Sequence, residues 1–193
     1  MNLYGASGHA KVIIDILKRS NIEISEIFDD NINIKNILGY KVTLFKESDK
    51  RDYFIISIGN NKIRKSISKK LDAIFGKAIH PDSIIDPTVT IQEGTVVMAG
   101  TVINSSVKIG KHCVINTSAS VDHDCVLGDF VHISPNATLC GGITVGEGTQ
   151  IGAGAVIIPN ITIGKWCTIG AGTAVISDMP DGVTVVGNPG RIL

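Results

Sequence analysis

The chain lacks an excess of charge of either sign. Its 193 residues hold 18 Lys and Arg against 18 Asp and Glu, so the formal net charge is zero. Nucleic acids and anionic membranes attract basic proteins, and this balance gives no indication of either partner. The two parts of the chain differ, because residues 1–80 hold 14 basic and nine acidic side chains while residues 81–193 hold four and nine. A basic first part favours a phosphate-bearing ligand, although lysines on exposed helices would give the same excess.

Long apolar runs are also missing. None reaches the roughly 20 residues that a membrane-spanning helix needs, and no charged leader with an apolar stretch follows Met1. We therefore expect a cytoplasmic protein. In that compartment cysteines are expected to be reduced, and the chain has four of them, Cys113, Cys125, Cys140 and Cys167.

An aliphatic residue recurs at every sixth position from Ile85 to Val175, without insertion. All sixteen positions hold Ile, Val or Leu, and the residue two places before each one is small or β-branched. A period of six fits neither an α-helix nor an alternating strand. It fits a coil of three short strands and three corners, so that 18 residues complete one coil. The repeat therefore predicts a parallel β-helix of about five coils.

The phase of the repeat predicts which side chains point inward. The aliphatic residue fills the interior, and three of the cysteines (Cys113, Cys125 and Cys167) occupy the small position beside it. They are expected to be core residues rather than disulfides or nucleophiles. Glycine is expected to help where a corner needs a positive φ, and it follows the aliphatic residue at Gly110, Gly128, Gly146, Gly152, Gly164 and Gly170.

Residues 1–80 predict a small α/β unit. A strand ends at Leu3-Tyr4, a glycine turn follows, and apolar residues then recur at helical spacing to Leu17. Further strands are expected over residues 22–28 and 53–58, with a second helix to Leu71. Such alternation gives a parallel sheet, and ligands bind at the carboxyl ends of its strands.

The glycine turn Gly5–His9 would point backbone N–H groups at an anion, although a plain tight turn is the alternative. The unit is short for a full dinucleotide fold, which favours a mononucleotide or a nucleotide sugar.

His123 lies between Asp122 and Asp124 at an outward position near a corner of the predicted coil. The 18-residue period places Gly141 beside it on the next coil. A histidine next to carboxylates is a suitable general base. A second column of small residues (Pro135, Ala153, Ala171) has the same period, and the two columns are expected to floor a groove.

A zinc site is the rival use of the histidines in the repeat. His112, His123 and His132 occupy three different phases, so they would not line one column. The chain also lacks the pair of histidines five positions apart that β-helix carbonic anhydrases use. We therefore expect no metal, and His112 is interpreted as an ordinary surface histidine.

Taken together, these features resemble the nucleotide-sugar acetyltransferases of the left-handed β-helix superfamily. The nearest branch N-acetylates UDP-4-amino sugars on the way to bacillosamine, and the sialic acid O-acetyltransferases share its architecture. The resemblance covers nearly the whole chain and implies left-handed coiling and a homotrimer. It is carried by Tyr4-Gly5-Ala6-Ser7-Gly8-His9, Asp29-Asp30, Ile58-Gly59-Asn60-Asn61-Lys62-Ile63-Arg64, Ile115-Asn116-Thr117-Ser118 before His123, and Val186-Gly187-Asn188-Pro189.

The resemblance also implies roles for single residues. His123 would be the general base, with Asp124 in place of the family's usual glutamate. Arg64 would be either a phosphate partner or an ordinary charge on a helix surface. The acetyl-CoA site would use His132, the N–H of Gly141 at the thioester carbonyl, Ala153 and Ala171, and the nucleotide-sugar pocket would use Ser7, Gly8, His9, Asp29, Asp30 and Asn60.

The expected fold is thus a small parallel, Rossmann-like α/β domain over residues 1–80, followed by a left-handed parallel β-helix over residues 81–193. The expected function is transfer of acetyl from acetyl-CoA to the amine of a nucleotide-linked amino sugar, directly within a ternary complex. Three alternatives remain. They are O-acetylation of a sugar such as sialic acid, a non-catalytic nucleotide-sugar-binding protein, and a zinc hydratase.

Overall fold

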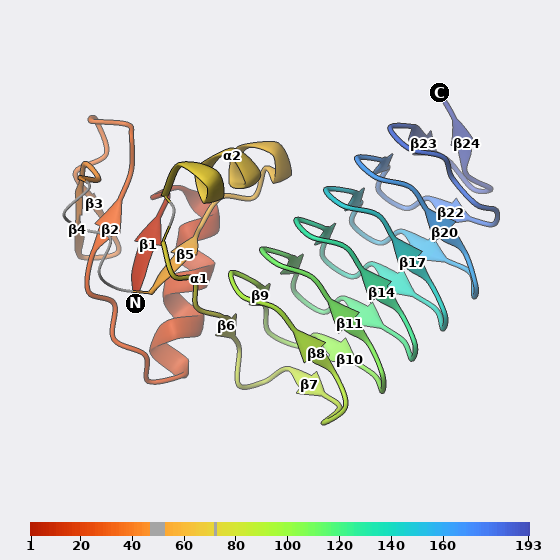
Figure 1. Ribbon diagram of the computed structural model, residues 1–193, viewed down its shortest axis with the longest axis horizontal. Helices are drawn as coiled ribbons and strands as arrows, with labels where there is room; N and C mark the ends of the chain where they lie inside the picture. The colour runs from red at the N-terminus through yellow and green to blue at the C-terminus, as the bar shows by residue number, and fades with distance from the viewer. Residues whose placement is uncertain (47–52, 72) are drawn as a thin grey trace.

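The computed structural model describes residues 1–46, 53–71 and 73–193. An α/β unit occupies one end, and a solenoid of stacked coils extends away from it to the carboxyl terminus (Figure 1). The parallel β-solenoid preceded by an α/β region with parallel strands confirms the predicted fold class. Within the described residues, no helix is both long enough and apolar enough to cross a membrane.

The α/β unit is one five-stranded sheet with two helices. Its strand order is β3-β4-β2-β1-β5, and every pairing is parallel except that of β3 with β4. The elements of the unit are β1 (Asn2–Tyr4), α1 (Gly8–Arg19), β2 (Ile27–Phe28), β3 (Asn36–Ile37), β4 (Tyr40–Thr43), β5 (Phe54–Ile56) and α2 (Asn61–Leu71). The strand predicted over residues 22–28 is therefore much shorter in the structure, where it is β2.

The hairpin β3–β4 was not predicted from the sequence. Its two turn residues, Leu38 and Gly39, both have positive φ angles, of 47° and 85°. Such a two-residue turn matches the twist of antiparallel strands, but its usual signal is Asn-Gly or Asp-Gly. Because leucine occupies the first position here, the sequence lacks that signal.

The solenoid has three faces, named here by their strand number. The six-strand face holds β7 (Ile84–Ile85), β10 (Val102–Ile103), β13 (Ser120–Val121), β16 (Thr138–Leu139), β19 (Val156–Ile157) and β22 (Ala174–Val175). The five-strand face holds β8 (Thr90–Ile91), β11 (Lys108–Ile109), β14 (Val126–Leu127), β17 (Thr144–Val145) and β20 (Thr162–Ile163). The eight-strand face holds β6 (Ala78–Ile79), β9 (Val96–Val97), β12 (Val114–Ile115), β15 (His132–Ile133), β18 (Gln150–Ile151), β21 (Thr168–Ile169), β23 (Thr184–Val186) and β24 (Arg191–Ile192).

The predicted coil length is confirmed by the register of these faces. Ile103 pairs with Val121, which pairs with Leu139, so each step up the solenoid is 18 residues. β6 begins the eight-strand face at Ala78, which pairs with Val96, slightly before the expected division at residue 80.

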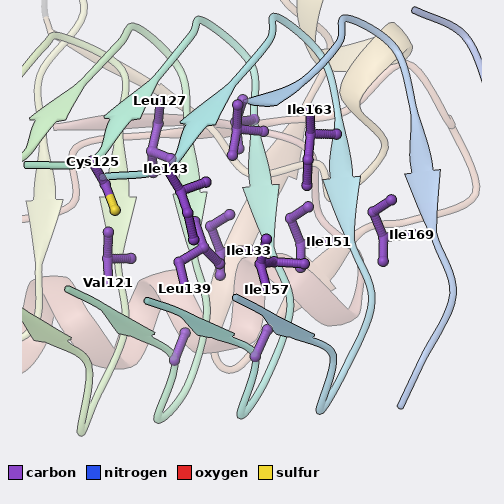
Figure 2. Close-up of a cluster of buried hydrophobic side chains, with 14 of the residues drawn as sticks. Val121, Cys125, Leu127, Ile133, Leu139, Ile143, Ile151, Ile157, Ile163 and Ile169 are labelled. Atoms are coloured by element: carbon purple, nitrogen blue, oxygen red, sulfur yellow. The ribbon is translucent and has the colours of Figure 1, made fainter. Parts of the chain in front are cut away.

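The solenoid core is made of the aliphatic positions of the repeat. Figure 2 shows them pointing into the interior from all three faces, with Cys125 among them. Cys113, Cys125 and Cys167 are free and at most 1% exposed, which confirms the expectation that they are core residues.

The glycines that follow the aliphatic positions do not have the predicted role. The positive φ angles of the corners lie two residues further on, at positions such as Ser106, Asp124 and Gly142. A Cβ on Gly152 would instead lie 2.6 Å from the backbone nitrogen of Ala171 on the next coil. These glycines are therefore needed where successive coils approach closely.

The α/β unit covers the first coils of one face and one corner of the solenoid. Apolar residues of α1, including Ile13 and Leu17, form one core cluster with Val96, Met98 and Val114 on the outside of the eight-strand face. Helix α2 lies over the corner between the five-strand and eight-strand faces. We call this the covered corner, and it comprises residues 110–113, 128–131, 146–149 and 164–167.

The other two corners are defined in the same way. The corner between the six-strand and five-strand faces holds residues 122–125 and 140–143, and we call it the base corner. The corner between the eight-strand and six-strand faces holds residues 134–137, 152–155 and 170–173, and we call it the alanine corner. In a three-sided prism the base corner lies opposite the eight-strand face, on which the α/β unit sits.

Candidate active site

The glycine turn after β1 packs tightly against β5. Gly5 has φ +112°, and a Cβ there would lie 2.6 Å from Cγ1 of Ile58. The hydroxyl of Ser57 donates to the carbonyl of Gly5 at 2.6 Å, which fixes the turn. Ser7 precedes α1, is exposed and makes no side-chain capping bond. The first turn of α1, which has no acidic residue, therefore presents N–H groups and the positive end of the helix dipole at the sheet edge.

Asp29 and Asp30, predicted to bind substrate, use their carboxylates within the chain. Asp29 accepts the N–H groups of Ala6 at 2.7 Å and Asn31 at 2.8 Å, so it holds two turns together. Asp30 accepts the hydroxyl of Tyr4 at 2.6 Å, and this bond is the main cause that lowers the pKa of Asp30. Both residues therefore shape the sheet edge, and direct contact with a substrate stays a prediction.

A cavity of about 340 Å³ opens beside Asp29 at the ends of β2 and β4. Lys35, Lys41 and Lys46 contribute to its lining, together with Asn31. The cavity was not predicted, and the only signal for it was the overall basic character of residues 1–80. Its lysines complement an anionic ligand at the same sheet edge.

His132 links the solenoid to the α/β unit. Its Nδ1 lies 3.3 Å from the carbonyl oxygen of Gly59, and its Nε2 lies 3.1 Å from Nδ2 of Asn116. Since a carbonyl oxygen only accepts, Nδ1 carries the proton and Nε2 accepts from the amide. The Oδ1 of Asn116 accepts the N–H of Thr117, which fixes the orientation of that amide.

His9 and Asn60 lie close to the same junction. The rings of His9 and His132 are 6.4 Å apart, and Oδ1 of Asn60 caps α2 by accepting the N–H of Ile63 at 3.0 Å. Burial, and then the charge of Arg64, lowers the pKa of both histidines to about 4. Both rings are therefore neutral at neutral pH and can serve as hydrogen-bonding groups.

His123 lies on the base corner in a different environment. Its side chain is 58% exposed, and its Nδ1 lies 2.8 Å from Oδ2 of Asp124. Asp122 accepts the backbone N–H of His123 at 2.8 Å and the amide of Asn104 at 2.7 Å. The hydrogen bond to Asp124, and then the charge of Asp122, raises the pKa of His123 above its usual value. Because Nδ1 donates to a carboxylate, Nε2 is left to accept a proton.

Gly141 lies against the ring of His123, as the 18-residue register predicts. A Cβ on Gly141 would lie 2.6 Å from Nε2 of His123, so a larger residue would displace this ring. Cys140 and Gly142 on either side donate their N–H groups within the solenoid. No acceptor in the described parts of the chain takes the N–H of Gly141, which leaves it as a donor next to the base.

Ala153 and Ala171 are exposed on the alanine corner. The six-strand face separates them from His123 and Gly141. The predicted columns therefore border one face at its two edges, and they do not floor one groove within a single chain.

Two expectations about charged residues are wrong. His112 is not a surface histidine, because it is only 4% exposed. Its ring lies between the rings of Phe130 and Phe75, with centroid distances of 5.1 Å and 4.5 Å. Arg64 is 1% exposed, and its hydrogen bonds go to carbonyl groups and an amide of the chain. It is therefore neither a surface charge nor free for a phosphate. Among the described residues, no three His, Cys, Asp or Glu side chains are grouped to hold a metal ion.

Two families match this chain. The PglD N-terminal domain matches residues 1–71, and the bacterial transferase hexapeptide (six repeats) matches residues 142–177. A curated relative, UDP-N-acetylbacillosamine N-acetyltransferase of Bacillus subtilis (strain 168), is 40% identical over 110 residues. The match covers 50% of this chain and 50% of that protein, so the chain spans about half the length of this relative.

Solved structures match over the whole chain. A histidine-to-asparagine variant of perosamine N-acetyltransferase from Caulobacter crescentus, in complex with CoA and GDP-perosamine, has a TM-score of 0.95 and 35% identity, and the match covers 100% of this chain and 95% of that one. The acetyltransferase domain of PglB from Neisseria gonorrhoeae, in complex with acetyl coenzyme A, has a TM-score of 0.91 and 34% identity, and the match covers 100% and 98%. These matches confirm the resemblance that the sequence motifs indicated.

Proposed function

The chain belongs to the hexapeptide-repeat nucleotide-sugar acetyltransferases that carry a PglD N-terminal domain, and we propose that it transfers acetyl from acetyl-CoA to the amine of a nucleotide-linked amino sugar. The observation that carries the proposal is the arrangement at the base corner. There the ring of an exposed His123, bonded to Asp124, lies against Gly141, whose N–H has no acceptor within the described residues. The relatives that hold CoA and GDP-perosamine support the two substrate classes.

The mechanism uses one base and one backbone donor. The sugar amine attacks the thioester carbonyl, and Nε2 of His123 accepts the proton that the nitrogen loses. The N–H of Gly141 stabilises the negative charge on the carbonyl oxygen. The C–S bond then breaks, and the imidazolium returns its proton to the departing thiolate, so CoA leaves as a thiol. The transfer is direct, and no acyl-enzyme forms.

Asp124 suits the orienting role that glutamate has in the family. It lies at a corner with φ 60°, and its carboxylate still reaches Nδ1 of His123 at 2.8 Å. This geometry supports Asp124 as the group that fixes the tautomer and stabilises the imidazolium.

The nucleotide sugar is proposed to bind at the carboxyl ends of β1, β2 and β5. The N-terminus of α1 and the lysine-lined cavity complement its phosphates. Contacts are proposed from Ser7, Gly8, His9 and Asn60, with Asp29 and Asp30 holding the surrounding turns. Acetyl-CoA is proposed to lie along Ala153 and Ala171, with His132 and Gly141 facing its acetyl end.

A homotrimer is proposed because, within a single chain, the base His123 lies on the opposite side of the solenoid from the α/β unit that holds the proposed nucleotide-sugar pocket. The base corner is the one opposite the face that the α/β unit covers. The six-strand face exposes apolar side chains, among them Ile84 at 68% and Val156 at 43%. Contact between copies along this region would bring His123 of one protomer toward the nucleotide pocket of another.

The test measures release of free thiol from acetyl-CoA with a panel of acceptors, followed by mass spectrometry of the product. The panel contains UDP-4-amino sugars, GDP-perosamine, CMP-sialic acid and free sialic acid. Turnover with a nucleotide-linked amine and a product that resists mild base supports N-acetylation. Turnover only with a sialic acid would replace the proposal by O-acetylation, and no thiol release with any acceptor would refute it.

A further inference from the structure

Arg64 is a buried cation with an unusual set of partners. It lies on α2, is 1% exposed, and makes five hydrogen bonds. A guanidinium has five N–H donors, so every one of them is used. All five acceptors are oxygens of neutral groups, and none is a carboxylate. A plain docking contact between two domains does not require a cation whose charge is left uncompensated.

On the α/β side, Arg64 holds the segment that follows β5. Its Nη1 donates to the carbonyls of Ile58 at 3.1 Å and Gly59 at 3.0 Å, and its Nη2 donates to Oδ1 of Asn61 at 3.0 Å. These three residues flank Asn60, which is proposed to contact the nucleotide sugar. Arg64 therefore binds this segment by hydrogen bonds on both sides of Asn60.

On the solenoid side, the same guanidinium holds two successive coils. Nε donates to the carbonyl of His112 at 2.7 Å, and Nη2 donates to that of Phe130 at 3.1 Å. His132 follows Phe130 closely and reaches the carbonyl of Gly59 with its own Nδ1. One rigid, planar group thus links the pocket segment, the covered corner and His132.

We propose that Arg64 is a positioning residue for the nucleotide sugar, which holds residues 58–61 against the covered corner so that Asn60 and His132 form one wall of the pocket. This inference rests on the proposed function. The hydrogen bonds of Arg64 reach neither the alanine corner nor His123, so its larger effect is expected on binding of the nucleotide sugar. An ammonium has three donors instead of five and no fixed plane, so lysine replaces the guanidinium only in part.

The uncompensated charge has a second effect at the same wall. The pKa values of His9 and His132 are lowered to about 4, first by burial and second by the positive charge of Arg64. Both rings therefore stay neutral beside the pocket.

Lys65 offers a matched control on the same helix. It pairs with Glu147 and lies over the rings of Phe130 and Trp166, so it also joins α2 to the covered corner. Among the described residues, the Lys65 side chain makes no hydrogen bond to residues 58–61. Replacing Lys65 removes a docking contact without releasing the pocket segment.

The experiment compares Arg64→Met, Arg64→Lys and Lys65→Met with the wild type. Steady-state thiol release gives KM for acetyl-CoA and KM for the nucleotide sugar that the wild type turns over best. Arg64→Met is expected to raise KM for the nucleotide sugar by between about tenfold and about a hundredfold, the effect of a misplaced binding group. Arg64→Lys is expected to give a smaller rise. In both variants KM for acetyl-CoA is expected to rise much less than KM for the nucleotide sugar, and the pH profile set by His123 is expected to be unchanged.

Lys65→Met is expected to change either KM by less than about twofold, as is usual for a partly exposed ion pair. If Arg64→Met does not fold, Arg64→Lys carries the test. Equal rises in both KM values, or equal effects of Arg64→Lys and Lys65→Met, would overturn the positioning role. An inactive wild type refutes the proposed function instead, and the positioning role is then judged from calorimetric binding of UDP and GDP, where equal Kd values for wild type and Arg64→Lys overturn it.

Discussion

The base corner and the covered corner are built from the same six-residue repeat, and yet they give histidine opposite properties. On the base corner His123 is exposed, faces two carboxylates, and has a raised pKa. On the covered corner His112 lies between two phenyl rings, and burial lowers its pKa to about 4. The repeat determines where the backbone of each histidine lies. What packs on that corner determines its chemistry.

The largest expected effect comes from removing the base. His123→Ala is expected to lower kcat by about 10² to 10⁴, the usual contribution of a general base. CoA binding, measured by calorimetry, should be unchanged, because the side chain is exposed and supports no core contact. Turnover close to that of the wild type would show that the base corner has no special role.

A smaller loss is expected when the space beside the base is filled. In Gly141→Ala the new Cβ would meet Nε2 of His123 at 2.6 Å, so the ring must move away from the amine. We expect kcat to fall by about tenfold to a hundredfold. The control is Ala153→Gly, which changes a small residue on a different corner and should retain the kcat of the wild type at saturating acetyl-CoA. Equal kcat values for all three proteins would contradict the assignment of Gly141.

The pH profile tests the electrostatics of the base corner. Asp124→Asn retains an acceptor for Nδ1 but removes the charge, so the pKa of His123 should fall toward its usual value. Since the neutral ring is the base, the acidic limb of kcat/KM should move to lower pH. Asp122→Asn should move it in the same direction and by less, because the hydrogen bond that His123 donates to Asp124 is the larger cause. A limb that stays in place in both variants would argue against His123 as the titrating group.

The smallest effect is expected on the covered corner, and it concerns stability. His112 has a folded-state pKa of about 4 against 6.5 for the free side chain, so the unfolded chain binds its proton first as pH falls. The stability that this residue contributes is complete above about pH 6.5 and is lost as pH falls toward 4. The phenyl ring of His112→Phe cannot be protonated. Because Nδ1 of His112 has no hydrogen-bond partner among the described residues, the replacement removes no bond from that atom.

We therefore expect His112→Phe to show a weaker fall in Tm between pH 6.5 and pH 4 than the wild type, with no loss of kcat. Thermal unfolding followed by circular dichroism at a series of pH values measures this slope. A slope as steep as that of the wild type would mean that His112 is not the group responsible.

Much of the solenoid could be predicted because its interior is periodic. Ile, Val and Leu at every sixth position predicted the coil length and the inward orientation of the cysteines. They also predicted that Gly141 lies beside His123. The α/β unit was predicted less well, since its elements do not repeat. The β3–β4 hairpin was missed because Leu38 stands where a turn usually has asparagine or aspartate.

The sequence by itself determined the coil of 18 residues and the local group of Asp122, His123 and Asp124. Both depend on spacing along the chain, which is visible without any tertiary contact. Only the tertiary structure decided that Arg64 is a buried clamp and that the carboxylate of Asp29 holds two turns. The physical reason is that burial and hydrogen-bond partners come from other elements, which a pattern within one segment cannot specify. In this protein the repeat determines the position of His123, and the packing of α2 onto the solenoid determines the proposed wall of the acceptor pocket.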